Sequence, residues 1–167
     1  VRWKAQSEEF SSVIRRLVGD VAVVSSFITY CGPFNAPFRD ELMAGVFRRD
    51  CAEKEIPLSQ DINIVRFMVE DSQIGAWALE GLPNDDLSLQ NAIMTTRAER
   101  WPIMIDPQSQ ANHWIKNRDA ANDLAAVTLG DKRFRMTLED CMRDGRPLLI
   151  EDIAEARDLA LNTNANT

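Results

Sequence analysis

The six residues from Asp106 to Ala111 occupy the position at which a phosphate-binding loop is expected, between a short apolar run and an amphipathic pattern. Such a loop normally reads Gly-x-x-x-x-Gly-Lys-Ser/Thr, because backbone N–H groups must approach the phosphates closely. The chain has no Gly-Lys pair, and the first carboxylate of the turn adds negative charge where a phosphate would lie. The turn therefore lies where a nucleotide site would be expected, but it lacks the residues that bind phosphate. Its members are Asp106, Pro107, Gln108, Ser109, Gln110 and Ala111.

Two acidic residues, Glu151 and Asp152, end a later apolar run. In P-loop ATPases the corresponding strand ends in Asp-Glu, and these residues hold magnesium and polarise water. The order is reversed in this chain, and no phosphate loop lies opposite the pair. We therefore expect a solvated strand end at this position and no catalysis.

The remaining candidates for chemistry have simpler explanations. His113 is the single histidine, so a His-rich metal site is excluded and a structural role is expected. Asp85 and Asp86 could suggest a pair of catalytic carboxylates, but adjacent residues rarely face one substrate. A loop is therefore expected at this position. The cysteines are far apart and form no Cys-x-x-Cys pattern, so we expect free buried thiols in a reducing compartment. They are Cys31, Cys51 and Cys141.

A strand and a helix must position the turn at 106–111. The apolar run before it predicts a buried strand over 102–106. Asp106 then offers a side-chain oxygen to unpaired helix N–H groups, and Pro107 has the fixed φ of a first helical position. A helix is predicted over 107–118, with one face formed by Ala111, Trp114, Ile115 and Arg118. We expect both flanking tryptophans to be structural: Trp101 and Trp114.

The rest of the second half alternates between strand and helix patterns. Strands are predicted over 124–129 and 147–151, separated by a helix over 132–144 that ends at Gly145. Repeated steps of this kind imply a parallel sheet with right-handed crossovers. Three strands are few for such a sheet, and we expect more beyond residue 153. The buried face of the helix is predicted to comprise Phe134, Leu138, Cys141 and Met142.

Residues 1–31 predict one long helix, with Gly19 as its weak point. Two heptad sets run along it: Ser7, Ile14, Val21 and Ile28, and Trp3, Phe10, Leu17 and Val24. The surrounding positions are polar before Val18, whereas nearly every face is apolar or small from Val21 to Tyr30, which predicts burial of that half. From the residues alone, two interpretations stay open: an ordinary amphipathic helix that enters a core, or the root of a coiled coil.

The segment between these halves predicts further helices. A helix is expected over 38–55, a helix or a strand over 59–69, and a short helix over 73–79. A turn at 81–85 leads to a helix that Ser88 caps and that continues to about residue 99. The apolar face of the helix over 38–55 is predicted to comprise Phe38, Leu42, Val46 and Phe47.

Composition limits the classes of function. A length of 167 residues suits one domain with an appendage, and a hydrophobic content of 45% is enough for a core. The net charge of -7 argues against nucleic acid and anionic membranes as partners. No apolar run approaches the roughly 18 residues of a membrane span. The chain begins inside a helix pattern, so we expect a piece of a longer protein.

Several stretches together resemble the fifth AAA+ module of dynein heavy chains, over roughly residues 1 to 153. The amino-acid sequence of these stretches resembles that of axonemal heavy chains and, more narrowly, that of outer-arm heavy chains. The stretches at the turn are Trp101-Pro-Ile-Met-Ile-Asp-Pro-Gln108 and Trp114-Ile-Lys116. The others are Gly81-Leu-Pro-Asn-Asp85 with Ser88 and Asn91-Ala92, Arg146-Pro-Leu-Leu-Ile-Glu151, Arg2-Trp3, Leu17-Val-Gly-Asp20 and Gly32-Pro-Phe34.

The resemblance implies an α/β fold: a partial AAA+, P-loop NTPase-like large subdomain with a parallel sheet and helices, preceded by a long N-terminal helix and a helical segment. Residues 1–18 would end the returning helix of the microtubule-binding stalk, and 19–153 would form the large subdomain with a degenerate nucleotide site. Residues 154–167 depart from the family pattern and are predicted to be a disordered tail.

The resemblance also implies a mechanical module that relays ring movement to the stalk and does not hydrolyse ATP. ATP and magnesium would bind in other modules of the parent ATPase motor, and this stretch would hold no cofactor or metal. Implied partners are the neighbouring AAA+ modules, the other stalk helix, the microtubule, and the dynein intermediate and light chains. The implied location is cytoplasmic and cytoskeletal, at the axoneme of a cilium or flagellum. The alternatives are an active P-loop NTPase with an unusual phosphate loop and a free-standing interaction module.

Overall fold

The computed structural model describes residues 2–153, with side chains from Gln6 onward and that of Trp3. The chain divides into two compact units, one up to Ile105 and one from Asp106 onward.

Helix α1 (Arg2–Tyr30) is a single helix that passes through Gly19 without interruption, as predicted. Beyond Gly19, which is also buried, the buried residues of α1 are spaced at i, i+3, i+4 and i+7, which is the pattern of one helical face. They are Asp20, Val23, Val24 and Phe27. The prediction that nearly every face is buried from Val21 to Tyr30 is wrong, because both of these residues are exposed. Only one stripe of α1 therefore packs on the core.

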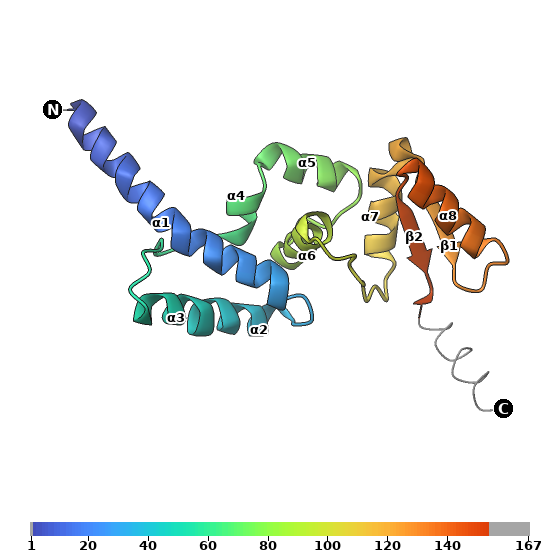
Figure 1. The fold of residues 1–167 in the computed structure, drawn as a ribbon, viewed down its shortest axis with the longest axis horizontal. Coiled ribbons are helices and arrows are strands. Elements are labelled where there is room, and N and C mark those ends of the chain that lie inside the picture. Colours follow the sequence, from blue (N-terminus) through green and yellow to red (C-terminus); the bar gives the residue numbers. More distant parts are fainter. Residues whose placement is uncertain (1, 154–167) are drawn as a thin grey trace. The chain divides into compact units, whose positions relative to one another are not determined.

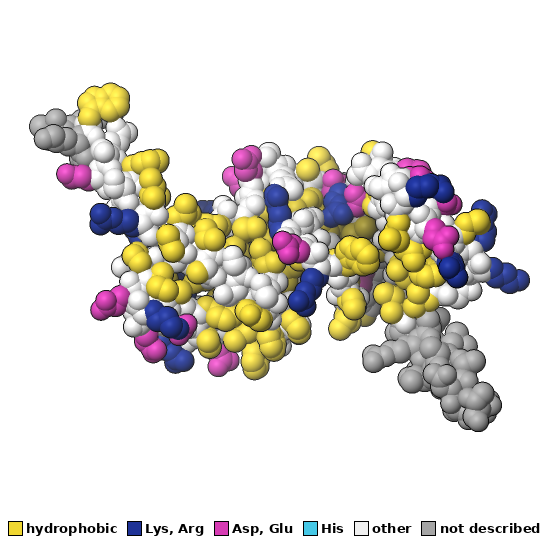
Figure 2. Space-filling model, viewed as in Figure 1, with side chains coloured by type: hydrophobic (Ala, Val, Ile, Leu, Met, Phe, Trp, Pro, Cys, Tyr) yellow, Lys and Arg dark blue, Asp and Glu magenta, His cyan; other side chains and the backbone are white. Residues whose placement is uncertain are grey.

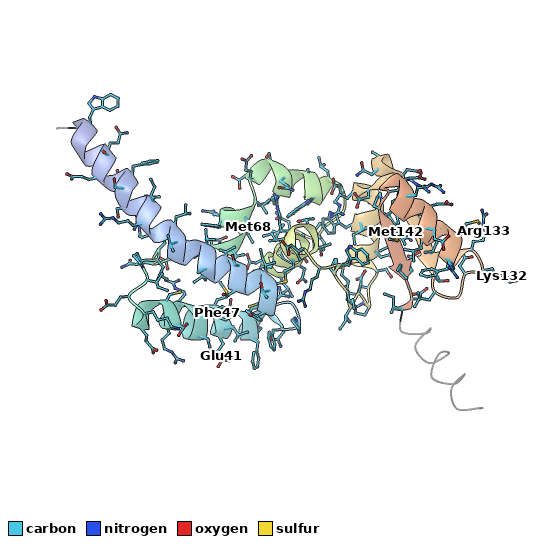
Figure 3. The ribbon with its side chains drawn as sticks, viewed as in Figure 1. Glu41, Phe47, Met68, Lys132, Arg133 and Met142 are labelled. Atoms are coloured by element: carbon cyan, nitrogen blue, oxygen red, sulfur yellow. The ribbon has the colours of Figure 1, made fainter. Side chains whose placement is uncertain are left out.

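The predicted helix over 38–55 is a continuous helical stretch of three parts: α2 (Ala36–Asp40), the π-helical η1 (Glu41–Phe47) and α3 (Arg48–Glu53). Figure 1 shows α2 and α3 beneath the C-terminal half of α1, and Figure 3 marks Glu41 and Phe47, which bound η1. A π-helix has more residues per turn than an α-helix, so it shifts the face that points inward.

This shift explains part of the error in the predicted face of the segment. Val46 was expected to be buried and is exposed, whereas Cys51, after η1, is buried. Phe38 was also expected to be buried and is exposed, while its neighbour Arg39 is buried; both lie before η1, so η1 does not account for them. An α-helical period places the wrong residues inside once a π-helical stretch intervenes.

Three more helices complete this unit: α4 (Ile64–Met68), α5 (Asp71–Leu79) and α6 (Asp86–Arg97). Of the helix or strand predicted over 59–69, the structure has a helix. It begins later than predicted, because Asn63 caps α4 by accepting from the N–H of Arg66 at 2.9 Å. The core of these helices includes Ile64, Val65, Trp77, Leu89, Ala92 and Ile93.

Asp85, and not Ser88, caps α6. One carboxylate oxygen of Asp85 accepts from the Ser88 N–H at 2.9 Å, and the other accepts from the Ser88 hydroxyl at 2.6 Å. These two bonds lower the pKa of Asp85 below its ordinary value, because they stabilise the ionised carboxyl.

The guanidinium of Arg39 lies at the centre of this unit and is 3% exposed. Its Nε donates to the carbonyls of Cys31 at 3.1 Å and Phe34 at 2.9 Å. Nη2 donates to the Asn91 side chain at 2.7 Å and to the carbonyl of Gly32 at 3.3 Å, and Nη1 donates to Gln90 at 3.2 Å. Burial lowers the pKa of Arg39, although an arginine stays charged. One side chain therefore joins the end of α1, α2 and α6.

The second unit contains α7 (Gln110–Arg118), η2 (Ala120–Asn122), β1 (Ala125–Thr128), α8 (Phe134–Asp144) and β2 (Leu148–Glu151). The two strands are parallel, with Ala125 opposite Leu148 and Thr128 opposite Glu151. The parallel sheet and its helical crossover confirm the predicted α/β class. Gly145 ends α8 with φ of 70°, a value that favours glycine.

The strand predicted over 102–106 is wrong, because the described residues contain two strands and this segment is neither of them. Trp101 is 89% exposed and Ile105 is 96% exposed, so Trp101 is not part of a core. An apolar run becomes a strand only where a neighbouring strand takes its backbone hydrogen bonds, and no described strand pairs with it. Met142 is also exposed, unlike the prediction, whereas Trp114 is fully buried as predicted.

Arg39→Ala should lower the free energy of unfolding by about 3 kcal/mol, because it leaves buried carbonyl and amide oxygens without a donor. Arg39→Lys should recover little of this loss, since an ammonium group cannot reproduce the planar fork of five donors. Urea denaturation of the three proteins measures the effect. Arg49→Ala, which breaks an exposed pair with Glu53, is the matched control and should change stability by less than about 1 kcal/mol. Equal effects at both arginines would contradict the role of Arg39.

Candidate nucleotide site

The carboxylate of Asp106 covers the start of helix α7. Its two oxygens accept from the backbone N–H groups of Gln110 at 3.0 Å and Asn112 at 2.9 Å. The prediction that Asp106 satisfies the unpaired N–H groups of this helix is confirmed. The helix nevertheless begins at Gln110, three residues later than predicted, after Ser109 in the left-handed conformation with φ of 58°.

The other residues of the turn offer no phosphate chemistry. Pro107 and Gln108 lie exposed in the turn, Gln110 begins α7 and Ala111 is half-buried. A phosphate binds at a helix start through free N–H groups and the positive end of the helix dipole. Two of those N–H groups already bind a carboxylate of the same chain. Asp106 therefore already supplies the negative charge that the start of α7 favours.

Glu151, at the end of β2, is not the solvated residue that its sequence position suggested. Its Oε1 accepts from Lys116 Nζ at 2.7 Å and from Asn112 Nδ2. The hydrogen bond from Lys116, then that from Asn112, lowers the pKa of Glu151 below its usual range. Asp152 is exposed, as predicted, with φ of 54°.

Asn112 links the two degenerate positions, because its backbone N–H binds Asp106 and its side chain binds Glu151. Lys116 stands one helical turn further along α7. Neither residue was predicted from the sequence to belong to the site. Their spacing of four on a helix that faces an acidic strand end was the available signal. The four side chains form a polar network without a free anion-binding group.

Most of the other candidates have structural explanations. Asp85 caps α6 and Asp86 is its first residue, so the pair is not the loop that was predicted. His113 is exposed on α7, and this exposure does not support the predicted structural role. All three cysteines are free and buried, as predicted. Among residues 2–153, no group of His, Cys, Asp and Glu side chains is arranged to hold a metal ion. Lys132 and Arg133 lie exposed in the turn before α8 (Figure 3).

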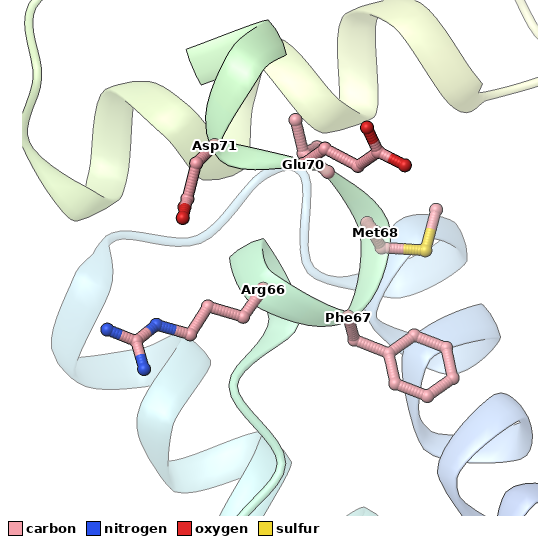
Figure 4. A pocket seen from close by; sticks show the side chains of 6 residues that line it. Arg66, Phe67, Met68, Glu70 and Asp71 are labelled. Carbon is pink, nitrogen blue, oxygen red and sulfur yellow. The ribbon is translucent and has the colours of Figure 1, made fainter. Parts of the chain in front are cut away.

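A pocket of about 710 Å³ lies in the first unit, between α4 and α5 (Figure 4). Its lining is one consecutive segment: Arg66, Phe67, Met68, Val69, Glu70 and Asp71. Figure 4 shows Arg66 and Phe67 pointing in different directions, so no set of polar groups converges on one point. The pocket lacks the converging groups of a catalytic site.

The N-terminal half of α1 carries an exposed apolar surface. Trp3 is 85% exposed, and further large apolar side chains follow it along the helix, where they appear in yellow in Figure 2. They are Phe10, Val13, Ile14, Leu17, Val18 and Val21. No helix among the described residues is long and apolar enough to span a membrane. We refer to these seven residues as the apolar stripe of α1.

The family model described as the ATP-binding dynein motor region matches residues 75–164. The chain belongs to this dynein family. The match includes residues 154–164 of the predicted atypical tail, 154–167, which lies outside the described residues.

Dynein heavy chains from several organisms are similar to the chain over nearly its whole length. The flagellar outer-arm dynein gamma chain of Chlamydomonas reinhardtii is 50% identical over 96% of this chain. The axonemal dynein heavy chains 8 and 5 of Mus musculus are 47% and 45% identical over 97% and 96% of it. The chain spans only 3–4% of the length of these relatives.

Glu151→Gln should reduce the stability of this dynein segment in a pH-dependent manner. A carboxyl whose folded pKa is lowered stabilises the fold above its unfolded pKa of about 4.3, and this contribution is lost as the pH falls through the folded value. The difference between wild type and Glu151→Gln should therefore be largest near neutral pH and disappear in acid.

Chemical denaturation between neutral and acidic pH measures this difference. The control is Glu139→Gln on α8, whose exposed pair with Arg135 should contribute little at any pH. A Glu151→Gln difference that stays constant across the range would show that the network does not depend on the ionised carboxyl.

Proposed function

We propose that this segment is a mechanical AAA+ module of a dynein heavy chain that relays ring movement to the microtubule-binding stalk and does not itself hydrolyse ATP. The family match and the heavy-chain relatives support the wider assignment. The finer role rests on the geometry of the degenerate site and of α1.

The carboxylate of Asp106 is the observation that carries the proposal. It binds the helix N–H groups that a phosphate would need, and it would repel a phosphate at the same position. Lys116, the basic residue nearest to this position on α7, already forms an ion pair with Glu151. These contacts favour a closed, structural role for the turn over the alternative of an active NTPase with an unusual loop.

The form of α1 supports the mechanical half of the proposal. A helix that transmits displacement must be continuous, and α1 runs without a break from an exposed half to a half packed on the core. Its apolar stripe follows the heptad positions Trp3, Phe10 and Leu17, which suits a second helix as the partner. That partner would be the other strand of the stalk.

The remaining assignments follow from the parent chain. In it, neighbouring AAA+ modules would flank this segment, and ATP and magnesium would bind in those modules and not here. The parent motor would bind microtubules and would assemble with dynein intermediate and light chains. We place it in the cytoskeleton, at the axoneme of a cilium or flagellum, because several relatives are named as axonemal or flagellar chains.

The purified chain should not bind magnesium-ATP with micromolar affinity. Calorimetric titration of wild type measures this directly, with Asp106→Ala as the companion variant. Asp106→Ala should lose about 1 kcal/mol of stability, because the start of α7 loses its cap. It should still fail to bind ATP tightly, since no lysine replaces the one that a phosphate loop requires.

The contradicting result is micromolar binding by wild type that is lost on replacement of residues 106–111. That outcome would favour the active NTPase.

A further inference from the structure

Gly19 of α1 lies against the segment that follows α3. A Cβ atom at this position would lie 2.3 Å from the carbonyl oxygen of Pro57 and 2.8 Å from Cβ of Leu58. Both distances are shorter than side-chain atoms tolerate, and one of the atoms belongs to the backbone. Glycine is therefore required here for a close approach between two segments and not for its backbone flexibility.

The next residue, Asp20, holds the same segment through Ser59. Its two carboxylate oxygens accept from the N–H and the hydroxyl of Ser59, each at 2.7 Å. Arg48 Nη2 of α3 donates to the Ser59 carbonyl at 3.2 Å. Ser59 thus uses its N–H, hydroxyl and carbonyl to join α1 to α3.

The carboxylate of Asp20 is 7% exposed, and no ion pair to it occurs among the described residues. A buried carboxylate depends strongly on its hydrogen bonds, because water no longer solvates it. Release of Ser59 would let water reach Asp20 and compensate for the lost bonds. The contact is therefore suited to open and close as a unit.

This contact lies at the transition along α1. Of the described side chains before Gly19, all are exposed apart from half-buried Arg16, whereas Gly19 and Asp20 are buried. The contact therefore fixes the helix at the residue where it leaves the core.

We propose that Gly19, Asp20 and residues 57–59 form a latch that sets the direction of the free half of α1, and that opening the latch lets this half swing. The proposal deepens the mechanical role proposed above, on which its use in the motor rests. The latch itself is a property of this chain without nucleotide or microtubules.

Two glycine substitutions with opposite expected signs test the contact. Alanine is the better helix former, so Gly75→Ala in α5, where nothing lies within 4 Å of the added Cβ, should leave the Tm unchanged or raise it. Gly19→Ala should lower the Tm by about 5 °C, because the methyl group pushes Pro57 away and separates Asp20 from Ser59. A Tm for Gly19→Ala at or above that of wild type would overturn the latch.

Ser59→Ala removes one hydrogen bond without adding atoms, so it serves as the test variant if Gly19→Ala does not fold. Hydrogen exchange of the residue 59 amide should become about tenfold faster, since one of the two bonds that hold Asp20 is lost. Ser26→Ala is the control, because the Ser26 hydroxyl donates to the Ala22 carbonyl within α1. Unchanged exchange in Ser59→Ala, or an equal change in Ser26→Ala, would contradict the latch.

The swing is measured by the distance distribution between spin labels at Ser12 on α1 and Ala52 on α3, both exposed positions. The distribution should be narrow in wild type and in Gly75→Ala and should broaden in Gly19→Ala, or in Ser59→Ala if the former does not fold. Equal widths would overturn the swing. Such a failure would leave the proposed function standing, whereas tight ATP binding would overturn that function and leave the latch intact.

Discussion

The helical unit depends on one buried cation, the guanidinium of Arg39. It receives no carboxylate partner among the described residues and is held by three carbonyls and two side-chain amides. Two of the carbonyls belong to Cys31 and Gly32, directly after α1, where the negative end of the helix dipole favours a positive charge. The same group reaches α6, so the end of the long helix cannot move without the helices that support it.

The long helix is consequently held at two points. Arg39 holds its C-terminal end, and the contact of Gly19 and Asp20 with residues 57–59 holds it where it leaves the core. Together with the buried stripe between them, these two points define the direction of α1. In the second unit, the polar network of Asp106, Asn112, Lys116 and Glu151 satisfies its own charges. The first unit thus holds α1 at two points, and the second uses the polar groups of its degenerate site for contacts within the chain.

The sequence predicted local features well where the deciding interactions are local. Helix α1, the stop at Gly145 and the parallel pair of strands follow from periodicity, a left-handed glycine and repeated strand–helix alternation. The capping role of Asp106 was also predictable, because it involves residues only four and six positions away.

The errors arose where distant or irregular structure decides the outcome. The π-helical η1 changed which residues in and after it face inward, so that Val46 is exposed and Cys51 is buried, and no simple period anticipates this. The run at 102–106 has a strand composition, but strand formation depends on a partner elsewhere in the chain. Gly19 was predicted to be a weak point of the helix, but the absence of a side chain there allows a close contact with residues about forty positions away. The link from Lys116 to Glu151 likewise spans separate elements.

We propose that α1 transmits movement as a rigid extension of the module. The most direct test inserts a short Gly-Ser linker between Val18 and Gly19 in the dynein heavy chain that carries this segment, and measures microtubule affinity in ATP and in ADP. If the claim holds, the ring continues to hydrolyse ATP, but microtubule affinity becomes the same in both nucleotides. An affinity that still differs between ATP and ADP, as in the unmodified heavy chain, would contradict the claim.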